Sequence, residues 1–215
     1  GCGGQLPLPK QFLKKGHKLI QESCGISIAD EVQTGFGRLG NHFWAFDFFD
    51  IKPDIVTLGK SMGNGFPLSA VITTKEIASR FDNGMEYFNS FGGNPVSSVV
   101  GNTVLKIIAD EGLQENAKDV GQYLKRQLLE LKLKNSIFED VRGEGLFLGI
   151  EIVDLEKDKT PHPILANYIV NKMRDKSILL SVDGPKKNII KIKPPLPFNK
   201  ENADFLVENF YKVLL

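Results

Sequence analysis

The chain has 215 residues, which is enough for one or two domains with a buried core. Apolar residues make up 41% of it and charged residues 25%, a composition that excludes disordered and collagen-like chains. Lysine and arginine number 27 against 26 for aspartate and glutamate, and a net charge of +1 argues against electrostatic binding of nucleic acid.

Cysteine content and hydropathy indicate the cellular compartment and whether the chain spans a membrane. The two cysteines, Cys2 and Cys24, cannot form a disulfide framework, so we expect a reducing, cytoplasmic environment. No run of about 18 apolar residues occurs, so we predict no membrane span. His17, His42 and His162 lack the spacing of metal ligands, and we predict no metal site.

The first half of the chain alternates between helical and strand patterns. Residues 10–24 mix apolar and charged side chains as a surface helix does, with Gly25 predicted to end it. Residues 82–94 contain Asn-Gly, Gly-Gly and Asn-Pro pairs and predict a loop. Short β-branched runs predict buried strands of an α/β sheet at 26–30, 54–58 and 68–74.

The second half predicts a smaller α+β unit. Two short strands are expected around the glycines of 143–145, within 137–153. Helical patterns lie at 95–110, 113–134, 163–176 and 200–215, and further strands are predicted at 178–182 and 188–193. We therefore predict an α/β fold with a large-domain portion at 1–120 and a small α+β domain at 121–215.

Two glycine-containing segments imitate nucleotide-binding motifs. Residues 35–40 spell G-x-G-x-x-G, but the aromatic segment 41–49 that follows has only a weak helical pattern. A turn that needs glycine flexibility explains 35–40 better. Gly59-Lys60-Ser61 lacks the first glycine of a P-loop, because Asp54 stands in its place. A dinucleotide-binding protein is therefore the weakest hypothesis.

An acid and an amine follow two neighbouring predicted strands. Asp30 ends the strand at 26–30, and Lys60 comes just after the strand at 54–58. Ligands of open α/β sheets gather outside the carboxyl ends of the strands, so these groups are candidates for one site. On chemistry alone, a structural ion pair explains them equally well.

Four segments occur in the order typical of one enzyme family. They are IADEVQTGFGRLG (28–40), DIVTLGKSMGNGFPLSA (54–70), FNSFGGNP (88–95) and VRGEGLFLGIE (141–151). Together they resemble class III (subgroup II) pyridoxal-phosphate aminotransferases over essentially the whole chain. The resemblance implies a fold type I transferase, represented by the C-terminal part of its large-domain mixed sheet plus the small C-terminal domain.

The resemblance implies a role for each matching residue. Lys60 matches the lysine that forms a Schiff base with pyridoxal 5'-phosphate, and a lysine amine with a lowered pKa is nucleophilic. Asp30 matches the acid that pairs with the pyridine nitrogen and keeps the ring an electron sink. Gln33 matches the residue near the ring 3-oxygen. Ser90, where the family usually has threonine, matches a contact to the partner subunit's cofactor phosphate. Arg142 matches an arginine that binds a substrate carboxylate.

Simpler explanations exist for several of these residues. Gln33 could cap a turn, and Arg142 could pair with one of its acidic neighbours, Glu139, Asp140 or Glu144. Glu31 and Arg38 could pair to brace the turn, and we treat them as structural. The aromatic residues of 43–49 fit a core or a dimer interface better than a stacking site.

Residues 84–101 and 178–198 look closest to the alanine–glyoxylate aminotransferase 2-like branch, which includes phospho-lyases acting on ethanolamine phosphate. We therefore expect amino-group transfer from an amine or amino acid to a keto acid, with phosphate elimination as the alternative. Both reactions begin with removal of a proton from Cα, so the matching residues do not choose between them.

The resemblance also implies that the chain is a part of a longer subunit. It begins with Gly1 instead of Met, near the midpoint of the family pattern. The phosphate-binding turn and the aromatic that stacks on the ring belong to the first half of that pattern. We expect a homodimer with sites at the interface, or else a truncated product without activity that persists as a folded remnant or as a dimerisation partner. A targeting segment in the missing part would place the protein in the mitochondrial matrix.

Overall fold

A computed structural model describes residues 1–214. The chain divides into two compact units. The α/β unit contains Leu8–Gly37 and His42–Leu113, and the α+β unit contains Gly1–Pro7, Arg38–Asn41 and the residues from Gln114 onward. The predicted domain boundary between residues 120 and 121 stays a prediction.

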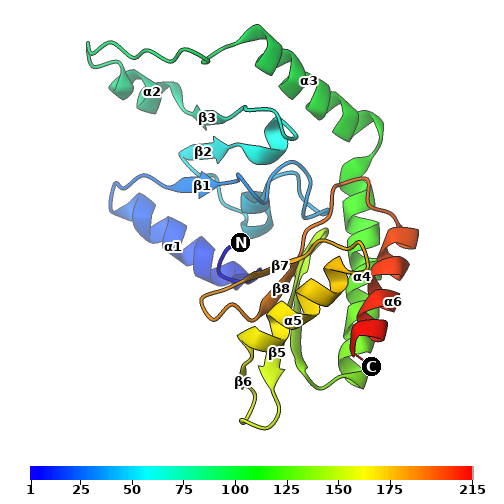
Figure 1. The fold of residues 1–215 in the computed structure, drawn as a ribbon. Coiled ribbons are helices and arrows are strands. Elements are labelled where there is room, and N and C mark those ends of the chain that lie inside the picture. The colour runs from blue at the N-terminus through cyan, green and yellow to red at the C-terminus, as the bar shows by residue number, and fades with distance from the viewer. Residues whose placement is uncertain (215) are drawn as a thin grey trace. The chain divides into compact units, whose positions relative to one another are not determined.

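The α/β unit is built on a three-stranded mixed sheet (Figure 1). Its strands are β1 (Ile28–Asp30), β2 (Ile55–Leu58) and β3 (Ala70–Thr73). Strand β2 lies in the middle, parallel to β1 and antiparallel to β3. The helices are α1 (Lys10–Glu22), α2 (Lys75–Phe81) and α3 (Pro95–Asp110), with the short 3₁₀ helices η1 (Ala45–Phe49) and η2 (Lys60–Met62).

The end of α1 differs from the prediction. Cys24, not Gly25, takes the left-handed conformation there, with φ of 54°. The N–H of Gly25 donates to the carbonyl of Ile20 at 2.8 Å, and that of Cys24 donates to Gln21 at 3.0 Å. This is the Schellman pattern with a cysteine in the usual glycine position. The prediction that Gly25 ends the helix was therefore wrong by one residue, because the left-handed turn occurs at Cys24.

The α+β unit is built on an antiparallel sheet in the order β4-β5-β8-β7, with β6 paired to β5. Its strands are β4 (Phe138–Glu144), β5 (Phe147–Asp154), β6 (Thr160–Pro161), β7 (Ser181–Asp183) and β8 (Ile189–Ile192). Its helices are α4 (Leu113–Lys134), α5 (Pro163–Arg174) and α6 (Lys200–Leu214). Figure 1 shows α4 and α6 side by side.

The main core lies between this sheet and its helices. Leu124, Leu128 and Leu131 repeat at helical spacing on α4, and all three are fully buried. They belong to one cluster with Ile150 of β5 and Phe210 of α6. Burying each of these side chains contributes about 1.5–3 kcal/mol to the stability of the folded state. The helical spacing of its apolar residues therefore turns one face of α4 into this core.

A carboxylate joins α6 to α4. Asp204 Oδ1 accepts hydrogen bonds from Gln127 Nε2 and from the Tyr123 hydroxyl, both at 2.7 Å. These two bonds, from Gln127 first and then from Tyr123, lower the pKa of Asp204. The ionised carboxylate is therefore favoured in the folded state.

Asp204→Asn is expected to make stability less dependent on pH in acid. The pKa of an aspartate in an unfolded chain is about 3.9. The ionised Asp204 therefore stabilises the fold at pH values above that pKa. That contribution is lost as the pH falls through the lower folded pKa, so wild type and variant should converge there. Urea unfolding at neutral and acidic pH measures this. Glu208→Gln, an exposed change on the same helix, is the control, and a constant difference between wild type and Asp204→Asn would contradict the prediction.

The long helices confirm the sequence expectations, whereas the short helix α2 was not predicted. Residues 95–110 and 113–134 form α3 and α4 with the predicted bounds. Thr74 caps α2 by accepting a hydrogen bond from the N–H of Ile77.

Within residues 1–214, no helix is long and apolar enough to span a membrane.

Candidate active site

The carboxyl ends of β1 and β2 bring the candidate acid and amine to one edge of the sheet. Asp30 is the last residue of β1 and lies opposite Thr57 of the parallel strand β2. Lys60 follows β2 after Gly59. A Cβ added to Gly59 would lie 3.7 Å from both methyl groups of Val32. The segments that carry Asp30 and Lys60 are therefore in van der Waals contact.

Lys60 has a strained backbone. Its φ of 41° lies in the left-handed region, which a lysine rarely adopts. Such strain costs on the order of 1–3 kcal/mol and clusters at functional sites. The exposed side chain lines an open depression of about 530 Å³, formed by Lys60, Ser61, Asn64, Gly65, Phe66, Pro67 and Leu68. The amine is thus held at a concave surface where a ligand can reach it.

Asp30 precedes a tight turn, and Gln33 lies within it. Asp30 is exposed, and its Oδ1 accepts a hydrogen bond from the N–H of Val32 at 3.1 Å. Gln33 is half-buried three residues further along. Phe36 and Gly37 in the same turn have φ of 63° and 74°, so residues 35–40 form the predicted turn that relies on unusual backbone conformations. One carboxylate, one amide and one amine therefore come from neighbouring segments.

Glu31 and Arg38 each have partners that the sequence did not indicate. The Glu31 carboxylate accepts hydrogen bonds from Thr34 and from the N–H groups of Ala45 and Phe46. Arg38 Nη1 donates to the carbonyls of Leu146 and Pro194 at 3.0 and 2.8 Å. Burial lowers the pKa of Arg38. These contacts differ from the Glu31–Arg38 pair that the sequence suggested, since each side chain is hydrogen-bonded within its own unit.

Ser90 lies in the exposed loop 82–94. The side chain of Asn94 at the end of this loop caps α3 by accepting hydrogen bonds from Val96 and Ser97. The aromatic and methionine side chains of the loop are largely solvent-exposed: Met85 at 81%, Tyr87 at 69%, Phe88 at 79% and Phe91 at 81%. Large apolar side chains that are exposed close together in one loop are a candidate interaction surface.

Arg142 lies on β4 in the α+β unit, and its side chain is only 11% exposed. Its Nη1 contacts Glu151 at 2.6 Å and Asp140 at 3.0 Å, and its Nε donates to the carbonyl of Gly4 at 2.9 Å. Burial opposes the charge, but the hydrogen bonds to Glu151 and Asp140 outweigh it and raise the pKa of Arg142. Of its three acidic candidates, Asp140 is a partner, while Glu151 is a partner the sequence did not suggest.

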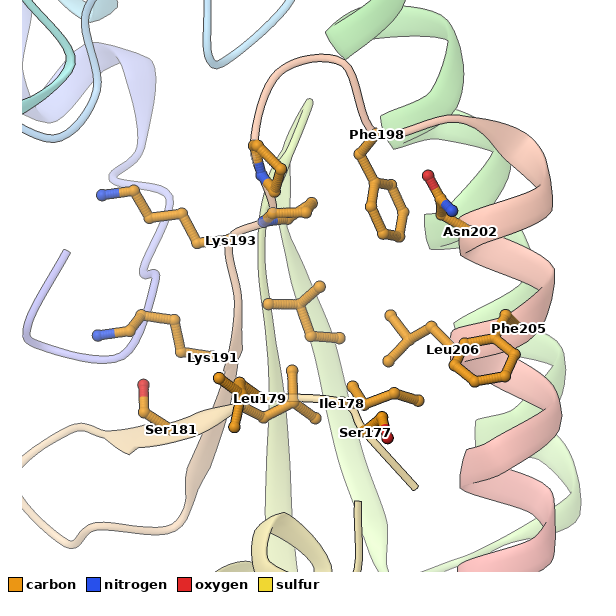
Figure 2. Close-up of a pocket in the computed structure, with 14 residues that line it drawn as sticks. Ser177, Ile178, Leu179, Ser181, Lys191, Lys193, Phe198, Asn202, Phe205 and Leu206 are labelled. Atoms are coloured by element: carbon orange, nitrogen blue, oxygen red, sulfur yellow. The ribbon is translucent and has the colours of Figure 1, made fainter. Parts of the chain in front are cut away.

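A second hollow lies in the α+β unit (Figure 2). It has a volume of about 600 Å³ and lies between residues 177–181, residues 191–195 and α6. Phe198 and Leu206 contribute to its apolar wall. The Lys191 ammonium at its rim is paired with Asp183 at 2.9 Å. Polar side chains line the hollow as well, among them Ser181, Lys193 and Asn202, and the sequence indicated a role for none of them.

Comparison with known proteins identifies the family of this chain. The sequence model of the class-III aminotransferases matches residues 1–214. The chain belongs to this family. The family that the four sequence motifs predicted is therefore confirmed.

Two curated relatives carry the names of an aminotransferase and of a phospho-lyase. Alanine–glyoxylate aminotransferase 2 homolog 2, mitochondrial, from Arabidopsis thaliana is 48% identical over 208 residues, which cover 97% of this chain and 43% of that protein. Ethanolamine-phosphate phospho-lyase homolog 1 from Caenorhabditis elegans is 45% identical over 204 residues, covering 94% of this chain and 44% of that protein. This class-III aminotransferase chain thus spans less than half the length of either relative.

A solved structure confirms the predicted fold class. A phospholyase from Arthrobacter in complex with phosphoethanolamine superimposes with a TM-score of 0.96 at 37% identity, covering 100% of this chain and 51% of that one. The chain therefore has the fold type I architecture of its family. The roles of Lys60, Asp30, Gln33, Ser90 and Arg142 stay predictions.

Proposed function

We propose that this chain contributes the lysine-bearing part of the active site of a pyridoxal-phosphate-dependent aminotransferase. The activity is transfer of an amino group from an amine or amino acid to a keto acid. The observation that carries the proposal is the strained, exposed Lys60 at the sheet edge that it shares with Asp30. Membership of the class-III family supports the same reaction class.

The side chains at this edge have the chemistry that pyridoxal 5'-phosphate requires. The Lys60 amine opens onto a depression and can bind an aldehyde carbon covalently. The Asp30 carboxylate can hold a proton on a pyridine nitrogen, and the Gln33 amide can donate to a ring oxygen. When bound, pyridoxal phosphate supplies an electron sink that makes the Cα–H bond of an amine substrate acidic. Once the substrate amine has displaced Lys60 from the aldehyde carbon, the freed Lys60 Nζ would take the proton from the substrate Cα.

Arg142 is proposed to bind a substrate carboxylate. Its contacts with Gly4, Asp140 and Glu151 occupy Nε and Nη1, and they fix the plane of the guanidinium. The Nη2 edge is the part proposed to donate to a carboxylate, because a guanidinium offers five N–H donors in a planar fork. Glu151 and Asp140 would then act by holding Arg142 in one orientation.

Phosphate elimination is the second candidate function. The observation that favours it is the TM-score of 0.96 with a phospholyase in complex with phosphoethanolamine. In this reaction Lys60 again takes the proton from Cα, and the electron pair left behind expels inorganic phosphate from the neighbouring carbon. The substrate would be a phosphorylated amine such as ethanolamine phosphate.

We propose a second copy of this chain as its macromolecular partner. The exposed apolar side chains of the loop 82–94 support a homodimer, because association would remove them from water. Ser90 lies in the same loop, so its hydroxyl would reach the cofactor phosphate of the partner subunit. We place the protein in the cytoplasm or the mitochondrial matrix, since two cysteines are too few for the disulfide framework of a secreted protein.

Cofactor uptake followed by a paired assay tests the proposed function. The protein with pyridoxal phosphate should gain a visible absorbance band, which borohydride bleaches while adding the cofactor mass to the Lys60 peptide. Keto-acid-dependent amino transfer is the expected activity, and phosphate release without a keto acid would identify the lyase instead. No uptake by the chain, alone or combined with the unmatched part of a relative, would overturn the proposal in favour of an inactive remnant.

A further inference from the structure

Glu31 is a buried acid next to the proposed cofactor-binding aspartate. Its residue is 2% exposed, and it is the sole buried acid among residues 1–214. An ionised carboxylate is kept in such a place only when hydrogen bonds replace its hydration. The proposed chemistry gives Glu31 no part, although it directly follows Asp30.

Three donors surround the Glu31 carboxylate. The Thr34 hydroxyl and the N–H of Ala45 donate to Oε2 at 2.9 and 3.0 Å, and the N–H of Phe46 donates to Oε1 at 2.9 Å. Ala45 and Phe46 begin η1, and Trp44 before them provides no side-chain cap. Glu31 therefore satisfies N–H groups that would otherwise lack a partner at the start of this helix.

The backbone of Glu31 is fixed as well. Its N–H donates to the carbonyl of Thr57 at 3.0 Å, which extends the β1–β2 ladder one residue beyond Asp30. Its carbonyl accepts a hydrogen bond from Gly35 at 3.0 Å. A Cβ on Gly35 would lie 2.9 Å from the Trp44 ring, so the turn packs directly on the indole. Residue 31 is thus tied to the strand, to its own turn and to η1.

We propose that Glu31 is a positioning residue that sets where Asp30 and Gln33 meet the cofactor. This inference rests on the proposed function. The Asp30 side chain is exposed and bonds locally to Val32, so the backbone that Glu31 anchors determines its position. Gln33 lies inside the turn closed by the Gly35–Glu31 hydrogen bond. Glu31 acts through these two residues, because its own carboxylate is fully engaged.

Glu31→Gln tests the proposal with the shape of the side chain retained. One amide oxygen cannot accept from both Oε positions, so one backbone N–H of η1 loses its acceptor. The affinity for pyridoxal phosphate is expected to fall roughly tenfold, the order of effect of one hydrogen bond to a charged group. The protein has a single tryptophan, Trp44, so its emission reports this junction without any cofactor. Emission should shift, and amide exchange at Val32 and Gly35 should accelerate.

A double-mutant cycle separates positioning from general structural support. If Glu31 acts through Asp30, then Glu31→Gln should cost little affinity in an Asp30→Asn background. Additive losses in the cycle would overturn the proposal, as would unchanged cofactor affinity. Glu76→Gln makes the same charge change at an exposed site in the first turn of α2, and it should leave both readouts unchanged.

The two proposals fail in different ways. Absence of cofactor uptake by the wild-type protein would overturn the proposed function. Trp44 emission and amide exchange at residues 30–35 need no cofactor, and unchanged values in Glu31→Gln would overturn the anchoring role. Glu31→Ala removes all three acceptor contacts and should enlarge every effect; if it does not fold, Glu31→Gln alone decides.

Discussion

Lys60→Ala is expected to abolish turnover while leaving the chain folded. Removing the amine removes both the covalent hold on the cofactor and the group that moves the Cα proton. General acid–base catalysis alone contributes about 10²–10⁴-fold, so a loss of roughly 10⁴-fold or more is expected. The measurement is keto-acid-dependent amino transfer and phosphate release by the protein supplied with pyridoxal phosphate.

The fold should tolerate this substitution for two reasons. The Lys60 side chain is exposed, and exposed substitutions usually change stability by no more than about 0.5 kcal/mol. Alanine also carries a Cβ, so the strain at φ of 41° is the same in both proteins. Lys106→Ala on the exposed side of α3 is the matched control and should retain full activity. Turnover by Lys60→Ala at a measurable fraction of wild type would refute the assignment of this lysine.

Phe210→Ala is expected to cause the largest loss of stability. Phe210 on α6 is 0% exposed, and its ring meets that of Phe138 edge-on at 6.1 Å between centroids. Truncating a buried phenylalanine costs about 3–5 kcal/mol, because the cavity left behind closes only partly. Urea unfolding of the two proteins measures the difference in the free energy of unfolding.

Phe205 provides the control on the same helix. It is 51% exposed, so Phe205→Ala removes the same atoms but leaves no sealed cavity, and it should cost well under half as much. Equal losses of stability in the two variants would contradict the buried position of Phe210 and the exposed position of Phe205. A loss below about 1 kcal/mol for Phe210→Ala would have the same meaning, since typical buried truncations exceed that value.

Local sequence determined the long helices because their signals are local. The pattern over 95–110 predicted α3, and the structure adds that the Asn94 side chain caps its start. The apolar pattern over 113–134 predicted α4, and Leu124, Leu128 and Leu131 on this helix are buried. Capping and helical periodicity act over three or four residues, so they are readable without knowledge of the fold.

The candidate site was only partly predictable. Asp30 and Lys60 could be placed at one sheet edge because parallel strands have their carboxyl ends together. The contact between Arg142 and Glu151 joins neighbouring strands whose register the sequence does not state, and Asp140 alone among its predicted partners was recovered. Long-range pairing depends on register and packing, which local patterns leave open.

The sequence by itself determined the helical periodicity, most strand positions and the order of motifs that identified the family. It did not indicate β6, and the strands predicted as buried at 26–30 and 68–74 have exposed side chains such as Ile28 and Val71. Tertiary structure alone decided that Glu31 binds Ala45 and Phe46, and that Lys60 sits in a left-handed conformation. The reason is physical: propensity and periodicity are properties of neighbouring residues. A buried carboxylate finds its donors, and a strained residue is held in place, only when distant segments have packed against it.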